Sequence, residues 1–306
     1  MEQYLFLGVK IEGKGQSQMQ KTPIFFTPQT DLSVEEIKKL LEGKFALGER
    51  IVVKLHFGEP GNKTALHPAE VRPWVEALNE LGHQEVLLFD CPVFYPSERD
   101  SKEGYEKSIA EQGWNEIGAQ TEVGDEYETV MTREGEIKIA KILTEAKNLL
   151  ILSHVKGHQL AGFGGAIKNI GIGAVAPETK GFVHGFDPRA ERTSNAGKFQ
   201  WLPERIGLVV AETAQKMPAG RTVFVNLMKR MTKRCDCAVD SGKILLEDMG
   251  TMIGDNIVAI DQASLDMINE KAGRNIFLEA NKMDPESQIE WTARESGLSR
   301  EYELVK

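Results

Sequence analysis

The sequence predicts an α/β fold with a mixed, mostly parallel sheet that is covered by helices on both faces. Two observations lead to this prediction. Short apolar runs alternate with stretches of helical period along the 306 residues, and this alternation is typical of a sheet that carries helices on both sides. No internal repeat of about 20–50 residues is visible, so a repeat architecture is not expected. We therefore expect residues 1–306 to form one domain.

Apolar runs of strand length mark the expected strands. They lie at residues 4–10, 50–57, 85–90, 149–154, 222–228 and 256–261. Residues 120–140 are charged and hold short alternating runs, which predict a further β excursion.

Amphipathic stretches at residues 33–43, 67–82, 203–217 and 261–273 predict helices. Ser33 followed by Glu36 forms a capping-box pattern at the start of the first. Gly82 stands where a helix C′ residue is expected. Residues 180–202 show no clear period, so we expect a long loop there, and such loops are often functional or disordered.

Composition excludes several classes of function. The net charge is −9 and no broad basic region is present, so we expect neither nucleic acid nor an anionic membrane as partner. No apolar run approaches the roughly 18 residues of a membrane helix. The first residues, MEQYLFLGVKIEGKG, lack the order of a signal peptide, which indicates a cytoplasmic protein. Homo-oligomer formation stays open.

The segment Ser153–Gly173, which follows the apolar run 149–152, has the composition of an anion-binding loop. In open α/β sheets, ligands lie beyond the carboxyl ends of strands. Glycines there let backbone N–H groups converge on an anion, and a following helix start adds its dipole. Tight turns are the alternative interpretation. The expected ligand-binding residues are Lys156, Gly162, Gly164, Gly165 and Asn169, with Lys168 close enough to neutralise the anion.

His154 and His158 in the same segment are four residues apart. On a helix they could chelate a metal, but Gly157 lies between them and a strand precedes them, so a loop is favoured. Acid–base work, contact with the anion and structural hydrogen bonding all remain open for these two histidines.

Two further loops begin where predicted strands end. The segment 54–64 carries Lys54 and His56, and could face the same crevice as the glycine-rich loop or be a solvated turn. The segment 88–100 carries Cys91, which we expect to be inert because buried cysteines usually are. Arg99 in this segment is suited to clamp a carboxylate or phosphate.

Cys235 and Cys237 form a Cys-x-Cys pair. A single pair of this spacing is a weak metal signal, and a site would need His154, His158 or His184 to complete it. Redox use of the pair and two reduced core cysteines are the alternatives. With three cysteines in all, a disulfide framework is not expected.

The order of motifs KLHFGEPGNKT, LLFDCPVFYPSERDS, LSHVKGHQLAGFGGAIKNIGIG, CDC and DNIVAIDQASLDMIN resembles one family over nearly the whole chain. It is the family catalogued as domain of unknown function 362, whose members are often labelled uncharacterised iron–sulfur centre proteins. GFVHG at 181–185, with His184, is similar to the family's Gly-x-x-His element.

Many members of that family carry an inserted ferredoxin module after this histidine. Here the region 180–202 contains FDPRAERTSNAGKFQW, which has no cysteine. Two cubane clusters need about eight thiolates, so we predict a chain without iron–sulfur clusters. Gly-Gly-x-x-Lys at 164–168 also resembles the lysine loop of nickel-pincer lactate racemases, in which the lysine holds a pyridinium-type cofactor.

These patterns predict an enzyme of unknown specificity that acts on a small anionic molecule, with a metal ion as an optional cofactor. The alternatives are a non-catalytic protein that binds an anion, a cofactor or a metal, and a remnant of an electron-transfer protein. The candidate catalytic residues are His56, His154, His158 and Lys168; the candidate anion ligands include Lys54 and Arg99; and the candidate metal ligands are Cys235, Cys237 and His184.

Overall fold

The computed structural model describes residues 21–185 and 201–305. An eight-stranded sheet forms the centre of these residues, in the order β14-β1-β13-β10-β7-β2-β3-β4. Strands β10, β7, β2, β3 and β4 run parallel to one another, as do β14 and β1, whereas β13 is antiparallel to both β10 and β1. Its strands are β1 (Thr22–Thr27), β2 (Ile51–Lys54), β3 (Val86–Asp90), β4 (Gln120–Val123), β7 (Leu149–His154), β10 (Thr222–Met228), β13 (Gly250–Gly254) and β14 (Tyr302–Val305). The predicted fold class, a mixed and mostly parallel sheet, is confirmed.

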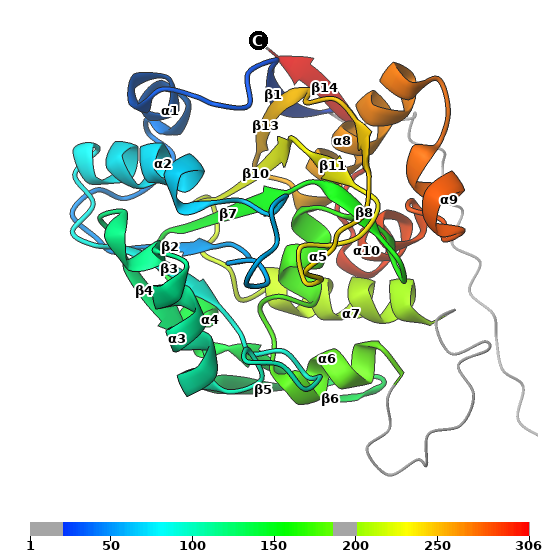
Figure 1. Ribbon diagram of the computed structural model, residues 1–306, viewed down its shortest axis with the longest axis horizontal. Helices are drawn as coiled ribbons and strands as arrows, with labels where there is room; N and C mark the ends of the chain where they lie inside the picture. The colour runs from blue at the N-terminus through cyan, green and yellow to red at the C-terminus, as the bar shows by residue number, and fades with distance from the viewer. Residues whose placement is uncertain (1–20, 186–200, 306) are drawn as a thin grey trace, which may run out of the picture.

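Helices cover both faces of this sheet (Figure 1). Successive side chains of β7 point to opposite faces of the sheet, and both faces are apolar. Leu150 and Leu152 belong to one apolar cluster, and Leu149 and Ile151 belong to the other. The first cluster includes helices α1 (Val34–Leu41), α2 (Pro68–Glu80) and α3 (Lys102–Glu111). The second includes α5 (Ala166–Gly171), α6 (Pro177–Val183), α7 (Leu202–Ala214), α8 (Ile257–Ala272), α9 (Ile276–Asn281) and α10 (Ser287–Ser296).

Smaller elements surround the sheet. β5 (Tyr127–Thr132) and β6 (Gly135–Ala140) form a hairpin followed by α4 (Lys141–Thr144), which confirms a β excursion within 120–140. β8 (Lys156–His158) pairs with β9 (Gly162–Gly164), and β11 (Met231–Thr232) pairs with β12 (Ile244–Leu246). A short 3₁₀ turn occupies Trp114–Glu116. None of the helices in the described residues is long and apolar enough to span a membrane.

The predicted start of α1 and the predicted end of α2 are confirmed. Ser33 caps α1, and its hydroxyl and the Glu36 carboxylate form both bonds of a capping box. Helix α2 ends just before Gly82, which has the positive φ of 91° expected at a C′ position.

The strand predicted at 256–261 is wrong, because these residues begin α8. The Asn256 side chain accepts hydrogen bonds from the backbone N–H groups of Val258 and Ala259, and so starts the helix. Every residue from Ile257 to Leu265 is buried. An all-round buried helix shows no amphipathic period, and its first turns therefore resemble a strand.

Two other predictions concern residues that lie wholly or partly outside the described residues. The expected strand at 4–10 lies outside the described residues. Of the loop expected at 180–202, Lys180–Val183 belong to α6 and Leu202 begins α7, whereas 186–200 lie outside the described residues.

The connections between strands distinguish the position between β2 and β7 from the rest of the sheet. From β2 the chain continues to β3 and β4 on one side, whereas from β7 it continues to β10 on the other. The strand order therefore reverses between β2 and β7. In open α/β sheets, the loops at the carboxyl ends of the two strands diverge at such a point and leave a crevice for a ligand.

Candidate functional site

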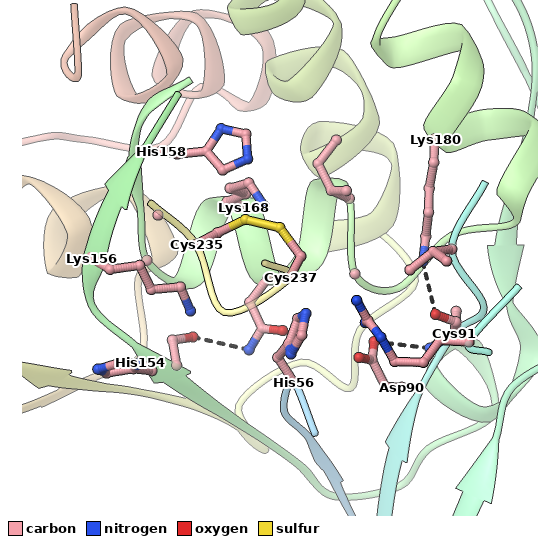
Figure 2. Close-up of a pocket in the computed structure, with 18 of the residues that line it drawn as sticks. His56, Asp90, Cys91, His154, Lys156, His158, Lys168, Lys180, Cys235 and Cys237 are labelled. Carbon is pink, nitrogen blue, oxygen red and sulfur yellow. Dashed lines mark hydrogen bonds between the residues drawn. A yellow bond between two sulfur atoms is a disulfide. The ribbon is translucent and has the colours of Figure 1, made fainter. Parts of the chain in front are cut away.

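A cavity of about 100 Å³ lies at this crevice (Figure 2). The predicted loops at 54–64, 90–99 and 153–173 all contribute to its wall, as does the Cys-x-Cys loop that follows β10. An apolar cavity of about 150 Å³ accepts benzene, so there is room for a ligand of a few non-hydrogen atoms. The lining residues with titratable side chains or sulfur atoms are His56, Asp90, Cys91, Tyr95, Arg99, His154, Lys156, His158, Lys168, Lys180, His184, Cys235 and Cys237.

Lys54 lies beneath the cavity, not in its wall. Its ammonium nitrogen is 3.0 Å from Asp90 Oδ1 and donates hydrogen bonds to Leu55 O and Asn169 Oδ1. Burial alone would raise the pKa of Asp90, but Lys54 and other nearby positive groups hold it well below its ordinary value. The expectation that Lys54 binds the ligand is therefore corrected: it neutralises Asp90 and orients Asn169, which does line the cavity.

His154 is fully engaged by other protein groups. Its Nδ1 lies 2.9 Å from Asp236 Oδ2 and its Nε2 lies 2.6 Å from Lys229 O. Because both ring nitrogens already contact oxygen atoms of the protein, neither is directed at a substrate proton or a metal. The predicted catalytic role of His154 is not supported by this arrangement.

Asp236 connects this histidine to a lysine of the cavity wall. Lys156 Nζ donates to Asp236 Oδ2 over 2.7 Å, and the side chains of both partners are buried. Burial would raise the pKa of Asp236, yet His154 and Lys156 hold it well below its ordinary value. Lys156 therefore faces the cavity, but its charge already has a partner.

The start of α5 binds an anion of the protein itself. The Asp261 carboxylate accepts hydrogen bonds from the backbone N–H groups of Ala166 (2.8 Å) and Ile167 (2.9 Å). Asn226 also donates to it, and burial raises the pKa of Asp261 to about 6. The expected use of this helix start and of Gly165 for a ligand anion is therefore corrected. Gly165 leaves space for Asp261, because a Cβ there would meet that carboxylate.

The other two glycines differ in role. Gly162 has a φ of 72°, and a Cβ on it would lie 2.7 Å from Met283 O, so it serves a tight turn against a neighbouring segment. It does not line the cavity, contrary to expectation. Gly164 does line it, and a Cβ there would lie 3.6 and 3.7 Å from carbons of Lys168 and Lys156.

Lys168 stands in the first turn of α5, as expected, and lines the cavity. Within the part of the chain that the structure describes, no carboxylate lies within ion-pair distance of its ammonium group. Burial, together with the positive charge of Lys156, lowers the pKa of Lys168 to about 7.

Lys180 of α6 is a second buried lysine in the wall, and the sequence did not single it out. Its ammonium group donates to Cys91 O (2.9 Å) and Pro92 O (2.6 Å), and burial lowers its pKa to about 8. Its position four residues before His184 was the available signal, since both side chains share one face of a short helix.

Arg99 uses only part of its guanidinium group in hydrogen bonds to other residues. Its Nε and Nη2 donate to Glu59, and Nη2 also donates to Tyr95 OH over 2.9 Å. The buried Nη1 has no hydrogen-bond partner in the described residues. Arg99 lines the cavity, so the predicted clamp keeps one free donor.

The other three histidines of the cavity wall have lowered pKa values. Burial lowers the pKa of His56 and His158 well below the ordinary value, and that of His184 to about 4. His56 Nδ1 accepts from Gly58 N, and His158 Nδ1 accepts from Leu160 N and Ala161 N. In both rings the proton is therefore on Nε2. His184 Nδ1 instead donates to Lys180 O, and its ring packs against Phe94.

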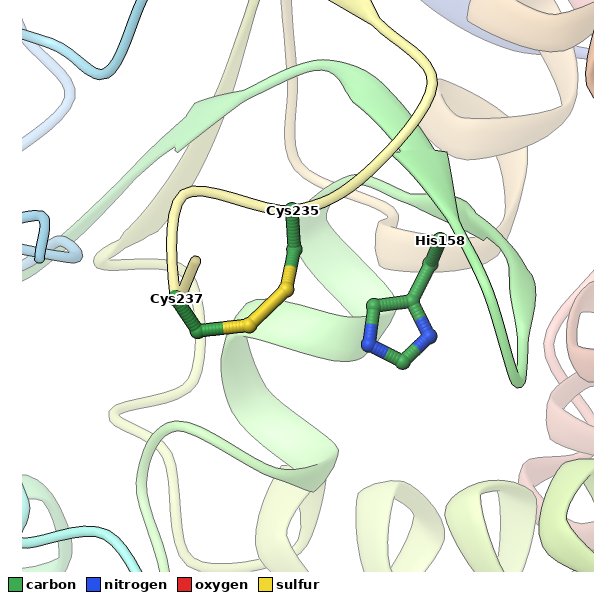
Figure 3. Close-up of side chains that lie close together, drawn as sticks. All are labelled: His158, Cys235 and Cys237. Atoms are coloured by element: carbon green, nitrogen blue, oxygen red, sulfur yellow. A yellow bond between two sulfur atoms is a disulfide. The ribbon is translucent and has the colours of Figure 1, made fainter. Parts of the chain in front are cut away.

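Cys235 and Cys237 are joined by a disulfide (Figure 3). The histidine beside them is His158, with a ring nitrogen within 4.8 Å of each sulfur. His184 is not part of this group, and a disulfide offers no thiolates, so the predicted set of Cys235, Cys237 and His184 does not form a metal site here. Cys91 is buried with its pKa raised to about 12, as expected for an inert thiol.

Residues from two neighbouring loops fix the Cys-x-Cys loop. Asn62 Nδ2 donates to Ala238 O and to Ser241 Oγ, each over 2.7 Å. Tyr95 OH donates to Cys237 O, and Asp236 is bound as described above. The disulfide is therefore held in the wall of the cavity by contacts from several strand-end loops.

Comparison with known proteins identifies one family, and distantly similar solved structures include two that are described here. The family described as "Domain of unknown function (DUF362)" matches residues 51–266. A crystal structure of a Thermotoga maritima protein is 15% identical with a TM-score of 0.45, covering 88% of this chain and 60% of that one. The lactate racemase apoprotein from Thermoanaerobacterium thermosaccharolyticum is also 15% identical, with a TM-score of 0.41 and coverage of 67% and 50%. The chain thus spans less than two thirds of either protein. No curated protein matches it.

Proposed function

The chain belongs to the DUF362 family, and we propose that its cavity is the substrate site of an enzyme that acts on a small carboxylate or phosphate. The single observation behind this proposal is the ammonium group of Lys168, a half-buried side chain that lines the cavity without a carboxylate partner in the described residues. A positive charge that is partly removed from water and has no counter-charge is unfavourable. A ligand anion would remove this cost.

The charge balance of the wall supports the same proposal. Asp90 is paired with Lys54, Asp236 with Lys156, and Glu59 with Arg99. Each of these carboxylates thus has a positive partner, and none of the described carboxylates forms an ion pair with Lys168 or Lys180. The site is therefore positive inside a chain whose net charge is −9. A narrow positive site in an acidic protein favours one small anion over a polyanion.

An enzyme is favoured over a simple binding protein because groups suited to proton transfer face the same space. The pKa of Lys168 is about 7, so this residue can give or take a proton near neutral pH. His56 and His158 present Nε2–H donors that can polarise a ligand oxygen. A cytoplasmic location is part of the proposal.

A non-catalytic anion-binding protein is the second candidate, since the same charge would serve it. The two differ in what happens to the bound molecule. An enzyme would exchange a carbon-bound hydrogen of the ligand with solvent or transfer a group, and the rate would depend on pH through Lys168. A binding protein leaves the ligand unchanged. Incubation of the best-binding carboxylate in D₂O, followed by NMR, separates them for reactions that abstract a carbon-bound proton.

The test of the pocket is Lys168→Met, which keeps most of the apolar stem and removes the ammonium group. We expect ligand affinity to fall by about 1.5–3 kcal/mol, or roughly tenfold to a hundredfold. Thermal-shift screening against phosphate and small carboxylates measures this, because a ligand that binds only the folded state raises the midpoint.

The matched control is Lys39→Met, which changes an exposed lysine of α1 in the same way. Equal stabilisation of the wild type, the control and Lys168→Met by the best anion would refute the proposed site. Unfolding stability without ligand should not fall in Lys168→Met, because the variant removes an unpaired, partly buried charge.

A further inference from the structure

The Cys235–Cys237 disulfide contributes little to the stability of the fold. It closes a loop of three residues, with a sequence separation of 2. By the loop-entropy relation such a loop contributes only roughly half as much stability as a 15-residue loop. Its position is more informative than its effect on stability, because both sulfur-bearing residues line the cavity.

His158 is oriented to donate to these sulfurs, not to hold a metal beside them. Its Nδ1 accepts hydrogen bonds from Leu160 N (3.3 Å) and Ala161 N (3.0 Å). The proton of the neutral ring is therefore on Nε2, the nitrogen on the disulfide side of the ring (Figure 3). A metal ligand needs a lone pair at that nitrogen, whereas a departing thiolate needs a hydrogen-bond donor.

The two sulfurs differ in access. Cys235 is buried with 7% exposure, whereas Cys237 is only partly buried. An incoming nucleophile therefore reaches Cys237, and Cys235 becomes the leaving group. Figure 2 shows Lys168 on the side of the cavity where Cys235 and His158 lie, and Lys168, Cys235 and Cys237 line the same cavity, so the counter-charge for an anionic group of the nucleophile lies in the same wall as the disulfide.

We propose that the Cys235–Cys237 pair is a redox centre that undergoes thiol–disulfide exchange with a small thiol carrying an anionic group. This inference rests on the anion site proposed above. Lys168 binds the anionic group of the thiol, and His158 Nε2–H donates a hydrogen bond to the leaving sulfur. The cavity volume of about 100 Å³ limits the thiol to a few non-hydrogen atoms.

The exchange balances in two steps. The substrate thiolate attacks Cys237 Sγ, the S–S bond breaks, and its electron pair stays on Cys235 as a thiolate. A second substrate thiolate attacks the sulfur of the first in the mixed disulfide and releases Cys237 as a thiolate. Two substrate thiols are thus oxidised to one disulfide, while the cysteine pair takes up two electrons and two protons and becomes two thiols.

The experiment compares mercaptoacetate with 2-mercaptoethanol, which has a similar length and no charge. Oxidised full-length protein is treated with each thiol, and alkylation followed by mass spectrometry counts the thiols formed at Cys235 and Cys237. Each rate is divided by the rate of the same thiol with a neutral small disulfide, which removes the difference in intrinsic reactivity. Buried Cys91 should stay unalkylated, and this shows that the fold is intact.

We expect a normalised preference for mercaptoacetate of about tenfold or more. Lys168→Met should abolish the preference without slowing 2-mercaptoethanol. His158→Ala should slow both thiols alike, whereas His67→Ala, a change of an exposed histidine in the protein, should slow neither. Equal normalised rates in the wild type, reaction only in denaturant, or three free thiols in the oxidised protein would each overturn the proposal.

The two proposals can fail separately. If acetate and phosphate stabilise the wild type but not Lys168→Met, and mercaptoacetate shows no preference, the anion site stands and the redox role is wrong. If no anion stabilises the wild type and only neutral thiols reduce the disulfide, the anion site is wrong and the proposed substrate class falls with it. Stoichiometric zinc binding by the reduced pair, lost in His158→Ala, would replace the redox centre with a metal site.

Discussion

Asp236→Asn should destabilise the protein strongly, because the Asp236 carboxylate anchors the Cys-x-Cys loop to the sheet. Both its oxygens contact His154 Nδ1, at 3.1 and 2.9 Å, and Oδ2 accepts from Lys156 Nζ at 2.7 Å. The substitution keeps the shape and removes the charge. Lys156, whose side chain is only 10% exposed, is then left without a partner.

The expected magnitude follows from this burial. Breaking a buried ion pair by removing one partner costs about 3–5 kcal/mol, since the other charge stays uncompensated. In Asp236→Asn/Lys156→Met neither charge remains, so the double variant should cost about 1–3 kcal/mol less than the sum of the two single variants. Glu49→Gln provides the control: its partner Lys147 is 64% exposed, and loss of such a surface pair costs about 1 kcal/mol or less.

Urea unfolding of the four proteins and the control measures these differences. The pH dependence gives a second readout. Because the folded pKa of Asp236 lies below its ordinary value of 3.8, its stabilisation is present above that value and is lost as the pH falls towards the folded pKa. The difference between wild type and Asp236→Asn should therefore shrink in acid. A cost at neutral pH of under about 1 kcal/mol, or additivity with Lys156→Met, would refute the reasoning.

Three further predictions concern other parts of the chain. Gly165→Ala should lower the unfolding free energy by about 1–3 kcal/mol, because the added methyl group would meet the Asp261 carboxylate. Gly181→Ala should instead stabilise α6 by up to about 1 kcal/mol, because a Cβ at Gly181 would have no atom within 4 Å. Equal unfolding free energies of the two variants in urea would contradict this packing argument. The folded pKa of Asp261, about 6, lies above its ordinary value of 3.8, so its contribution is present below 3.8 and lost as the pH rises through about 6. The stability of wild type relative to Asp261→Asn should therefore fall by about 3 kcal/mol across that window, and a pH-independent difference would count against it. Purified protein should contain no iron–sulfur cluster, since the chain has three cysteines and two cubanes need about eight thiolates; iron and acid-labile sulfide in cluster stoichiometry would disprove this.

The sequence predicted the framework of the site well because that framework is local. A strand, its end and the following loop occupy one short segment, so the loops after β2, β3 and β7 could each be recognised. The neighbouring parallel strands then bring those loops together. The fold class and the shared crevice follow from such short-range patterns.

The pairing of charges could not be predicted in the same way. His154 and Asp236 are 82 residues apart, and Ala166 N and Asp261 are 95 residues apart. Nothing in either short segment shows that a carboxylate elsewhere will occupy the histidine or the helix start. Lys54 and His154 thus resembled ligand-binding residues although their charges or lone pairs are used internally. Lys168 remains a candidate for its predicted role because none of the described carboxylates lies within ion-pair distance of it.

The central position of β7 also determines how the chain can fold. β7 pairs with β2 and with β10, both distant along the sequence, and the loops above it are joined by contacts such as Asn62 to Ala238, 176 residues apart. Native contacts of this range require large loops to close first, which slows folding. Neither the sheet centre nor the cavity can form from one part of the chain alone, so both should appear together in a single late step. The Cys-x-Cys pair is the exception, because its two sulfurs are neighbours in the unfolded chain and can join or separate at any stage.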